Sequence, residues 1–284
     1  MSSSKASPQG PARRSSLGWL FWLSVGWVAL TILLSILANL LPLPNPNLQN
    51  YAAINQSPSW THLLGTDDLG RDILSRTVYG SRVSLIVGFG AIAIGLGIGG
   101  TLGMVSGYRR GATDTLLNAA SYVLLAFPAL VAVMAIVTFW GHELWKITVV
   151  VGIASSPLAF RIVRAATLSV ASREFVTAAR AQGASSTRVL FREILPNILP
   201  LVVSFSLLGV AAVIVLEGSL AFLGLSVPVS TPSWGNMLNE GRNYLQVNPW
   251  LTVFPASAMF LFLLALNYVG DGLRQHFDVL EVKL

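Results

Sequence analysis

Few residues of this 284-residue sequence have the type and spacing that catalysis needs. Cysteine is absent, which excludes a thiolate nucleophile, a disulfide and a cysteine-ligated metal. The three histidines, His62, His142 and His276, lie in separate polar segments, whereas metal ligands normally cluster. The sequence has neither a Walker A motif for ATP phosphates nor a G-x-S-x-G nucleophile elbow. We therefore expect no catalytic residue, metal site or cofactor in this chain.

Glu217 is the one charged residue in the apolar run 197–225. A carboxylate at the centre of a bilayer costs about 2.5–3.5 kcal/mol, so such a residue is a functional candidate. A rise of 1.5 Å per residue from Asn197 places it about 30 Å along the helix, near the outer interface. We expect a structural role, in pairing or interhelical hydrogen bonding. A role in the substrate path or its gate is the alternative.

A glycine-rich stretch imitates a nucleotide-binding fingerprint. Residues 95–100 match G-x-G-x-x-G, but that motif needs a strand before it and a helix after it. Here it lies inside the uncharged run 83–107. Small residues on one helix face let another helix approach closely. The four-residue repeat therefore predicts helix packing through Gly95, Gly99, Gly103 and Gly107.

The composition of the whole sequence predicts the kind of elements that position these residues. Hydrophobic residues make up 54% and charged residues only 11%, whereas a soluble domain has about 25% charged residues. This excludes a soluble enzyme, a disordered protein and a nucleic-acid-binding domain. A spanning helix needs about 20 apolar residues. Six runs are long enough, and they predict an all-α polytopic membrane protein: 17–41, 83–107, 115–141, 147–168, 197–225 and 250–269.

The expected organisation follows from these runs. Residues 1–16 form a disordered cytoplasmic tail, and 17–82 form the first transmembrane helix and an extracytoplasmic segment. Residues 83–270 form a core of five spans, and 271–284 a cytoplasmic tail. With the N-terminus inside, 13 of the 18 Lys and Arg residues fall on the inner side, which predicts that both termini are cytoplasmic. A cleaved signal peptide is the alternative for the first run, but its apolar region would have only about 7–15 residues.

The polar insert 169–196 contains two short helix signals. Ser172 can cap a first helix that has Glu174 in its first turn and Gly183 at its end. A second short helix is expected over 188–195, ended by Pro196.

The first of these helices has one face of small residues around an aromatic ring. Phe175, Ala178 and Ala179 are spaced at i, i+3 and i+4, so they share this face. The face suits docking into a partner's groove. A helix resting on lipid headgroups is the alternative.

At these residues the sequence resembles a known family. Glu174-x3-Ala178-Ala179-x3-Gly183, followed by Ile194-Leu195-Pro196, resembles the coupling-loop signature of ABC importer permeases. Phe175 stands where that family often has tyrosine. Further segments resemble the C-type subunit of dipeptide/oligopeptide permeases, and together they extend the resemblance over roughly residues 15–278: 65–72, 75–76, 80–82, 84–85, 222–225, 232–235 and 270–274.

The resemblance implies a type I ABC importer permease fold with six transmembrane helices and a cytoplasmic coupling-helix loop. It implies a heterodimer with a homologous B-type permease in a bacterial or archaeal plasma membrane, surrounded by lipid. Two cytoplasmic ATPase subunits, or one fused ATPase, would bind ATP and Mg, and an extracytoplasmic binding protein would deliver cargo. Di- or oligopeptides are the expected cargo, nickel chelates or another small solute the alternative, and a stand-alone channel the remote one.

The resemblance also assigns roles to residues. Those expected to couple the permease to the ATPases are Glu174, Phe175, Ala178, Ala179, Arg180, Gly183, Ile194, Leu195 and Pro196. Arg173 and Arg180 are candidates for ion pairs with the ATPases. The candidates for contact with the binding protein are Asp67, Asp68, Arg71, Asp72 and Trp234, the last with an alternative role as a membrane-interface anchor.

Overall fold

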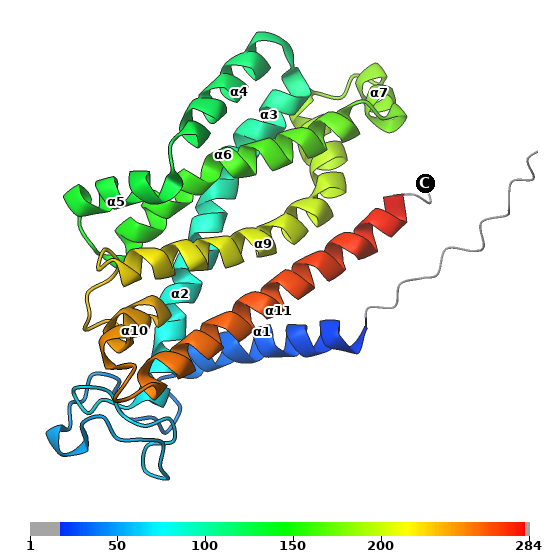
Figure 1. The fold of residues 1–284 in the computed structure, drawn as a ribbon. Coiled ribbons are helices and arrows are strands. Elements are labelled where there is room, and N and C mark those ends of the chain that lie inside the picture. Colours follow the sequence, from blue (N-terminus) through cyan, green and yellow to red (C-terminus); the bar gives the residue numbers. More distant parts are fainter. Residues whose placement is uncertain (1–17, 282–284) are drawn as a thin grey trace, which may run out of the picture.

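The computed structural model describes residues 18–281, in which every regular element is a helix (Figure 1). The predicted disordered tail, residues 1–16, lies outside this range. Five helices are long and apolar enough to cross a membrane, or six if one bent pair is a single span. The five are α1 (Trp19–Leu37), the continuous helix Ile73–Arg109, α6 (Leu144–Ala171), the continuous helix Ser186–Phe222, and α11 (Trp250–Glu281).

Two of the long helices change hydrogen-bond register along their length. The helix Ile73–Arg109 consists of α2 (Ile73–Gly95), a π-turn (Leu96–Gly100) and α3 (Thr101–Arg109). The helix Ser186–Phe222 consists of α8 (Ser186–Arg188), a π-turn (Val189–Ile194) and α9 (Leu195–Phe222). Four shorter helices connect the long ones: α4 (Gly111–Ala126), α5 (Ala129–Trp140), α7 (Glu174–Ala181) and α10 (Trp234–Gly241).

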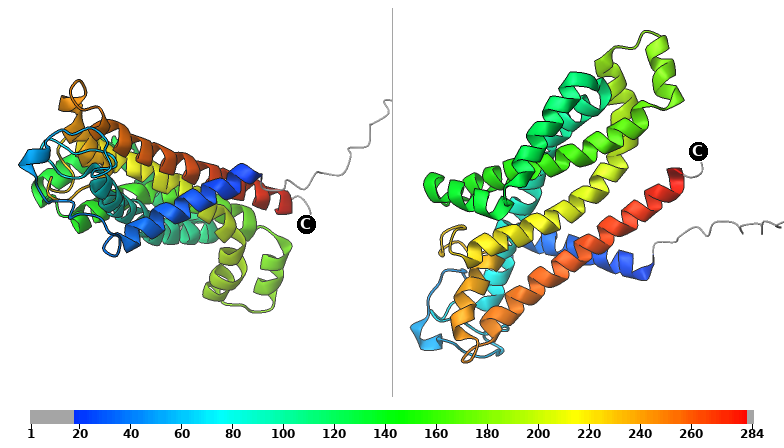
Figure 2. Two further views of the ribbon diagram at one scale, coloured as in Figure 1. Left: turned by 90° about the horizontal axis from the view of Figure 1, so that it is seen from below. Right: turned by 45° about the horizontal axis from the view of Figure 1, so that its top comes forward.

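The helices give the molecule two distinct ends. The beginning of α1, the end of α11 and α7 lie toward one end, while α10 and the loops before α2 lie at the other (Figures 1 and 2). In the sequence-based topology, the first is the cytoplasmic end and the second the outer end. These names are used below for the two ends.

The second spanning helix begins ten residues earlier than the apolar run predicted, at Ile73 instead of residue 83. Asp72 caps it, since its Oδ1 accepts a hydrogen bond of 2.8 Å from the Ser75 N–H. Arg76 makes this first part look like a polar loop, yet its side chain is fully buried and pairs with Glu240 at 3.0 Å. A long-range ion pair of this kind is not visible in the sequence.

The third predicted span, 115–141, is broken into α4 and α5, whose axes differ by 80°. Phe127 is extended there (φ −86°, ψ 134°), because a residue before proline is disfavoured in the helical region. Pro128 is then the N-cap residue of α5, where its missing N–H is tolerated because that position makes no N–H bond within the helix.

Pro196 does not end a short helix, so this prediction is wrong. The chain stays helical from Ser186 to Phe222. The π-turn before Pro196 shifts the register of the backbone hydrogen bonds, since the Leu195 N–H bonds the Leu190 carbonyl, five residues back. Pro196 therefore lies in the first turn of α9, where proline is tolerated.

The predicted C-terminal tail, 271–284, begins as a helix, because α11 continues beyond Gly270 to Glu281.

The glycine stripe lies against α6. A Cβ added at Gly99 would overlap the Ser156 carbonyl oxygen, and one at Gly103 would lie 2.5 Å from the Phe160 carbonyl oxygen. Gly95 faces Ser155. Gly107 completes the stripe against the end of α6. The absent side chains allow the helix Ile73–Arg109 and α6 to pack backbone to backbone.

Candidate functional site

The surface around α7 is the strongest candidate site at the cytoplasmic end. The hydroxyl of Ser172 donates to the Ser169 carbonyl at 3.1 Å and does not cap α7, so this prediction is corrected. Arg173 occupies the N-cap position, with an extended backbone. Gly183 ends the helix with φ of +84°, and the Ala184 N–H bonds the Ala179 carbonyl at 3.1 Å.

One side of α7 is fixed to the rest of the chain. Val176 is fully buried in a hydrophobic cluster with Val189 and Ile194 from the second π-turn. The Arg180 guanidinium lies over the Tyr108 ring, 4.4 Å from its centroid, a cation–π contact with the end of α3. Helix α7 is therefore held by α3 and by the helix Ser186–Phe222.

The opposite side of α7 is open to solvent. Phe175 is 38% exposed, and Glu174 and Ala178 are also exposed. The remaining predicted coupling residues divide into two groups. Gly183, Arg180 and Pro196 are exposed, whereas Ile194 is buried and Ala179 and Leu195 are partly buried. The outward face thus carries one aromatic side chain beside small ones, and the buried residues form its support.

An ion pair between α4 and α6 was not predicted from the sequence. Asp114 of α4 accepts from Arg164 of α6 through two hydrogen bonds, 2.5 Å to Nε and 2.6 Å to Nη2. The Ser106 hydroxyl of α3 donates to the same carboxylate at 2.5 Å. Paired bonds of this kind fix geometry as well as energy. They join α3, α4 and α6.

Glu217 lies near the other end of α9 and is completely buried. Its carboxyl oxygens accept hydrogen bonds from Ser226 at 2.8 Å and from Ser84 of α2 at 3.3 Å. Ser233, the N-cap residue of α10, also bonds it. Glu217 therefore joins α2, α9 and the loop that leads to α10. The hydroxyl groups are partners that the sequence did not reveal.

The acidic and basic residues before α2 form a buried ion cluster at the outer end. Arg71 pairs with Asp67 at 2.5 Å and with Glu240 of α10 at 3.0 Å. Arg76 pairs with the same Glu240 carboxylate. Asp68 lies at the edge of the cluster, 3.7 Å from Arg71. The cluster fastens the polar loop to α10.

Of the five residues expected to contact a binding protein, only Asp68 is partly exposed. Asp67, Arg71, Asp72 and Trp234 are all buried within the chain itself. The Asp72 carboxylate caps α2 and lies 3.0 Å from Nδ1 of His62, which donates a hydrogen bond to it in the tautomer that carries a proton on Nδ1. The Trp234 indole N–H bonds the Thr77 carbonyl at 3.1 Å, so this tryptophan anchors α10 to α2.

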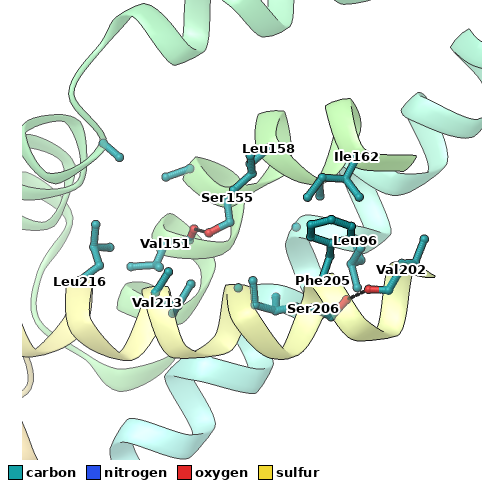
Figure 3. A pocket seen from close by; sticks show the side chains of 17 residues that line it. Leu96, Val151, Ser155, Leu158, Ile162, Val202, Phe205, Ser206, Val213 and Leu216 are labelled. Atoms are coloured by element: carbon teal, nitrogen blue, oxygen red, sulfur yellow. Dashed lines mark hydrogen bonds between the residues drawn. The ribbon is translucent and has the colours of Figure 1, made fainter. Parts of the chain in front are cut away.

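A cavity of about 150 Å³ opens between α6, α9 and the first π-turn (Figure 3). Leu158, Ile162 and Phe205 point into it, and Ala129 at the start of α5 also lines it. Ser155 and Ser206 bond carbonyls of their own helices, at 2.8 and 2.6 Å. None of its 17 lining residues is charged, so the cavity presents apolar side chains beside the break between α4 and α5.

Comparison with known protein families shows which family has this sequence pattern. The family described as "Binding-protein-dependent transport system inner membrane component" matches residues 99–279. The chain belongs to this family. It is accordingly a multi-pass inner-membrane permease component of a transport system that uses a binding protein.

Curated relatives match nearly the whole permease. The dipeptide transport system permease protein DppC of Alkalihalophilus pseudofirmus is 39% identical over 256 residues, covering 89% of this chain and 84% of that protein. The glutathione transport system permease protein GsiD of Pectobacterium atrosepticum is 39% identical over 245 residues, covering 86% and 80%. These matches agree with the C-type peptide permease subunit that the motifs indicated.

The fold also matches a solved structure. An inward-facing form of the MetNI methionine ABC transporter superposes with a TM-score of 0.60 at 17% identity, over 70% of this permease and 94% of that chain. The likeness supports the expected type I ABC importer permease fold.

Proposed function

We propose that this chain is one of two permease subunits of an ATP-driven peptide importer and forms half of its translocation path. The observation that carries this is the near-full-length identity of 39% to permeases named for dipeptide and glutathione transport. Partner ATPases bind ATP and Mg, an extracytoplasmic binding protein delivers the peptide, and both termini are cytoplasmic.

Helix α7 couples the permease to an ATPase. Its exposed face, with Phe175 beside Ala178, fits a groove on the ATPase surface. Its buried face, through Val176, is packed into the ends of the spanning helices. A displacement of α7 therefore moves the helix Ser186–Phe222 with it, and alternating access follows as a rigid-body change between two positions. An exposed ion pair contributes only about 0–1 kcal/mol, so shape dominates this docking.

The break between α4 and α5 supports pairing with a second permease. Within a bilayer, irregular backbone is tolerated only where protein or a water-filled cavity covers it. Phe127, at the break, is largely exposed in the single chain. The homologous permease therefore covers this face, with the path between the two subunits.

Peptide uptake by the reconstituted complex tests the coupling role. The complex of permeases, ATPases and binding protein is placed in proteoliposomes that contain ATP. Phe175→Ala should lower uptake about tenfold or more, as truncation of an interface hot spot costs more than about 1–2 kcal/mol. Phe139→Ala is the matched control, because Phe139 is 92% exposed on α5, away from α7. Equal uptake by both variants would contradict the coupling role.

The cargo is tested on the same proteoliposomes with dipeptides, longer peptides, glutathione and a nickel chelate. We expect ATP-dependent uptake of at least one peptide. Uptake of the nickel chelate alone would favour the alternative cargo. Uptake that needs no ATP would favour a channel.

A further inference from the structure

The loops before α2 extend beyond the ends of the spanning helices, at the end opposite α7 (Figures 1 and 2). We call residues 38–72 the outer segment. The family match begins only at residue 99, so the shared permease domain does not include this segment. Its only regular helix is the three-residue turn Tyr51–Ala53. A loop of this length inside a compact protein is usually functional or disordered.

The outer segment is held in one conformation by hydrogen bonds. The Asn55 N–H bonds the Asp67 carbonyl at 2.9 Å, and the Thr66 N–H bonds the Gln56 carbonyl at 3.0 Å. Asn248, from the loop before α11, donates to the Thr66 carbonyl at 2.8 Å. The buried ion cluster around Arg71 also holds this part of the loop, because it links Asp67 to Glu240 of α10. Side chains on this support are therefore preorganised, which lowers the entropic cost of binding.

Trp60 projects from this support. It is 97% exposed, on a turn closed by hydrogen bonds of 2.9 Å from the Ser59 N–H to the His62 carbonyl and 3.1 Å from the His62 N–H to the Ser59 hydroxyl. His62 ties the turn to Asp72 at the start of α2. A tryptophan that is almost completely exposed on a fixed turn is unfavourable in water. Its large apolar surface forgoes the free energy that burial would provide.

The composition of the segment favours a protein partner over lipid. Residues 38–66 contain no Asp, Glu, Lys or Arg. Leu48, Tyr51 and Leu63 are exposed on the same segment, among Asn, Gln and Ser residues. The cores of protein interfaces are depleted of charge and rich in aromatic residues. Surfaces that bind anionic lipid instead carry Lys and Arg.

We propose that the outer segment, with Trp60 as its central anchor, is the surface on which the extracytoplasmic binding protein docks. The inference rests on the proposed importer function, and it replaces Asp67, Arg71, Asp72 and Trp234 by exposed residues of the same region. Tryptophan is enriched among residues that dominate binding energy, which makes Trp60 the residue to test.

The experiment measures binding of the binding protein that co-purifies with the complex. The complete complex is placed in nanodiscs, and both the Kd and the stimulated ATPase rate are recorded. We expect Trp60→Ala to raise the Kd about tenfold or more, to leave the basal ATPase rate unchanged, and Trp60→Phe to lie between. Trp19→Ala is the control, because Trp19 is 73% exposed at the beginning of α1, at the other end of the molecule.

The outcomes separate this inference from the function on which it rests. If the wild-type complex binds and responds to the binding protein while Trp60→Ala equals Trp19→Ala, the docking surface is wrong and the importer function stands. If brominated lipids quench the wild-type complex more than Trp60→Phe, Trp60 contacts lipid and the proposal is overturned. If no binding protein stimulates the wild-type complex, the proposed function fails first.

Discussion

Glu217 illustrates how a residue that looks reactive can serve packing. It is the acceptor for serine hydroxyls from α2 and from the loop that leads to α10, and Gly218 beside it packs against Met259 of α11. A buried acceptor with several donors ties segments together, and its removal leaves those donors unsatisfied.

Substitution at Glu217 separates the structural role from a gate. Glu217→Ala should destabilise the permease by about 1–3 kcal/mol, because buried hydroxyls lose their acceptor. Glu217→Gln keeps one oxygen acceptor and should cost less. Thermal unfolding in detergent measures both, with the partly buried Glu193→Ala at the cytoplasmic end as control. If Glu217→Gln kept its melting temperature but lost peptide uptake, the gate would be the better explanation.

Glu240 makes stability at the outer end depend on pH. Burial raises the pKa of the Glu240 carboxyl above its ordinary 4.5, by more than Arg76 and Arg71 lower it. The folded protein therefore keeps this proton at a pH where the unfolded chain has lost it. The stability from this proton is complete below pH 4.5 and is lost as pH rises through the folded pKa.

Melting curves of the wild type and Glu240→Gln between pH 4.5 and neutrality test this sign. The wild type should lose stability relative to the variant as pH rises. Glu143→Gln, measured below pH 4.5, is a control of opposite sign: hydrogen bonds from Lys146 and Trp145 lower the pKa of Glu143, so the wild type should lose stability relative to this variant as the pH falls. If the stability of the wild type instead rose relative to Glu240→Gln as the pH increased, the attraction of the Glu240 carboxylate to the arginines would outweigh the effect of burial on its pKa.

At the scale of elements, the contact of the helix Ile73–Arg109 with α6 depends on particular glycines. Gly99→Ala should destabilise the permease by about 1–3 kcal/mol, because the added Cβ would overlap the Ser156 carbonyl oxygen of α6. Gly97 is in the same π-turn but faces open space, so Gly97→Ala is the matched control. Unfolding of the purified protein compares the two. Equal melting temperatures would show that α6 can shift without cost.

The sequence predicted elements better where local patterns decide them. The glycine repeat indicated a packing face, and Gly183 the end of α7, because both depend on spacing or on one residue's φ. The start of α2 was missed, since Arg76 looks exposed until Glu240, 164 residues later, is brought beside it. The burial of Asp67 and Trp234 was missed for the same reason. Pro196 was misread because a π-turn has no clear sequence signature.

For the whole molecule, long helices connect the two proposed docking faces, one at each end. Helix α6 begins beside the outer end of α5 and ends beside α7, and Arg164 near its end is held by Asp114. The apolar cavity lies between α6 and α9 (Figure 3). In the proposed mechanism, a displacement at α7 is transmitted along these helices to the walls of the cavity.

The pairing of Glu240 with Arg71 and Arg76 also constrains how the chain is made. Synthesis proceeds from the N-terminus, so both arginines are inserted long before α10 exists. Until then they lack this carboxylate partner and have Asp67 as their shared one. Completion of the outer end therefore waits for the last part of the chain. A ribosome that stalls before Glu240 therefore leaves the two arginines with only the carboxylates of their own loop, Asp67 and Asp68, and leaves that loop without its attachment to α10.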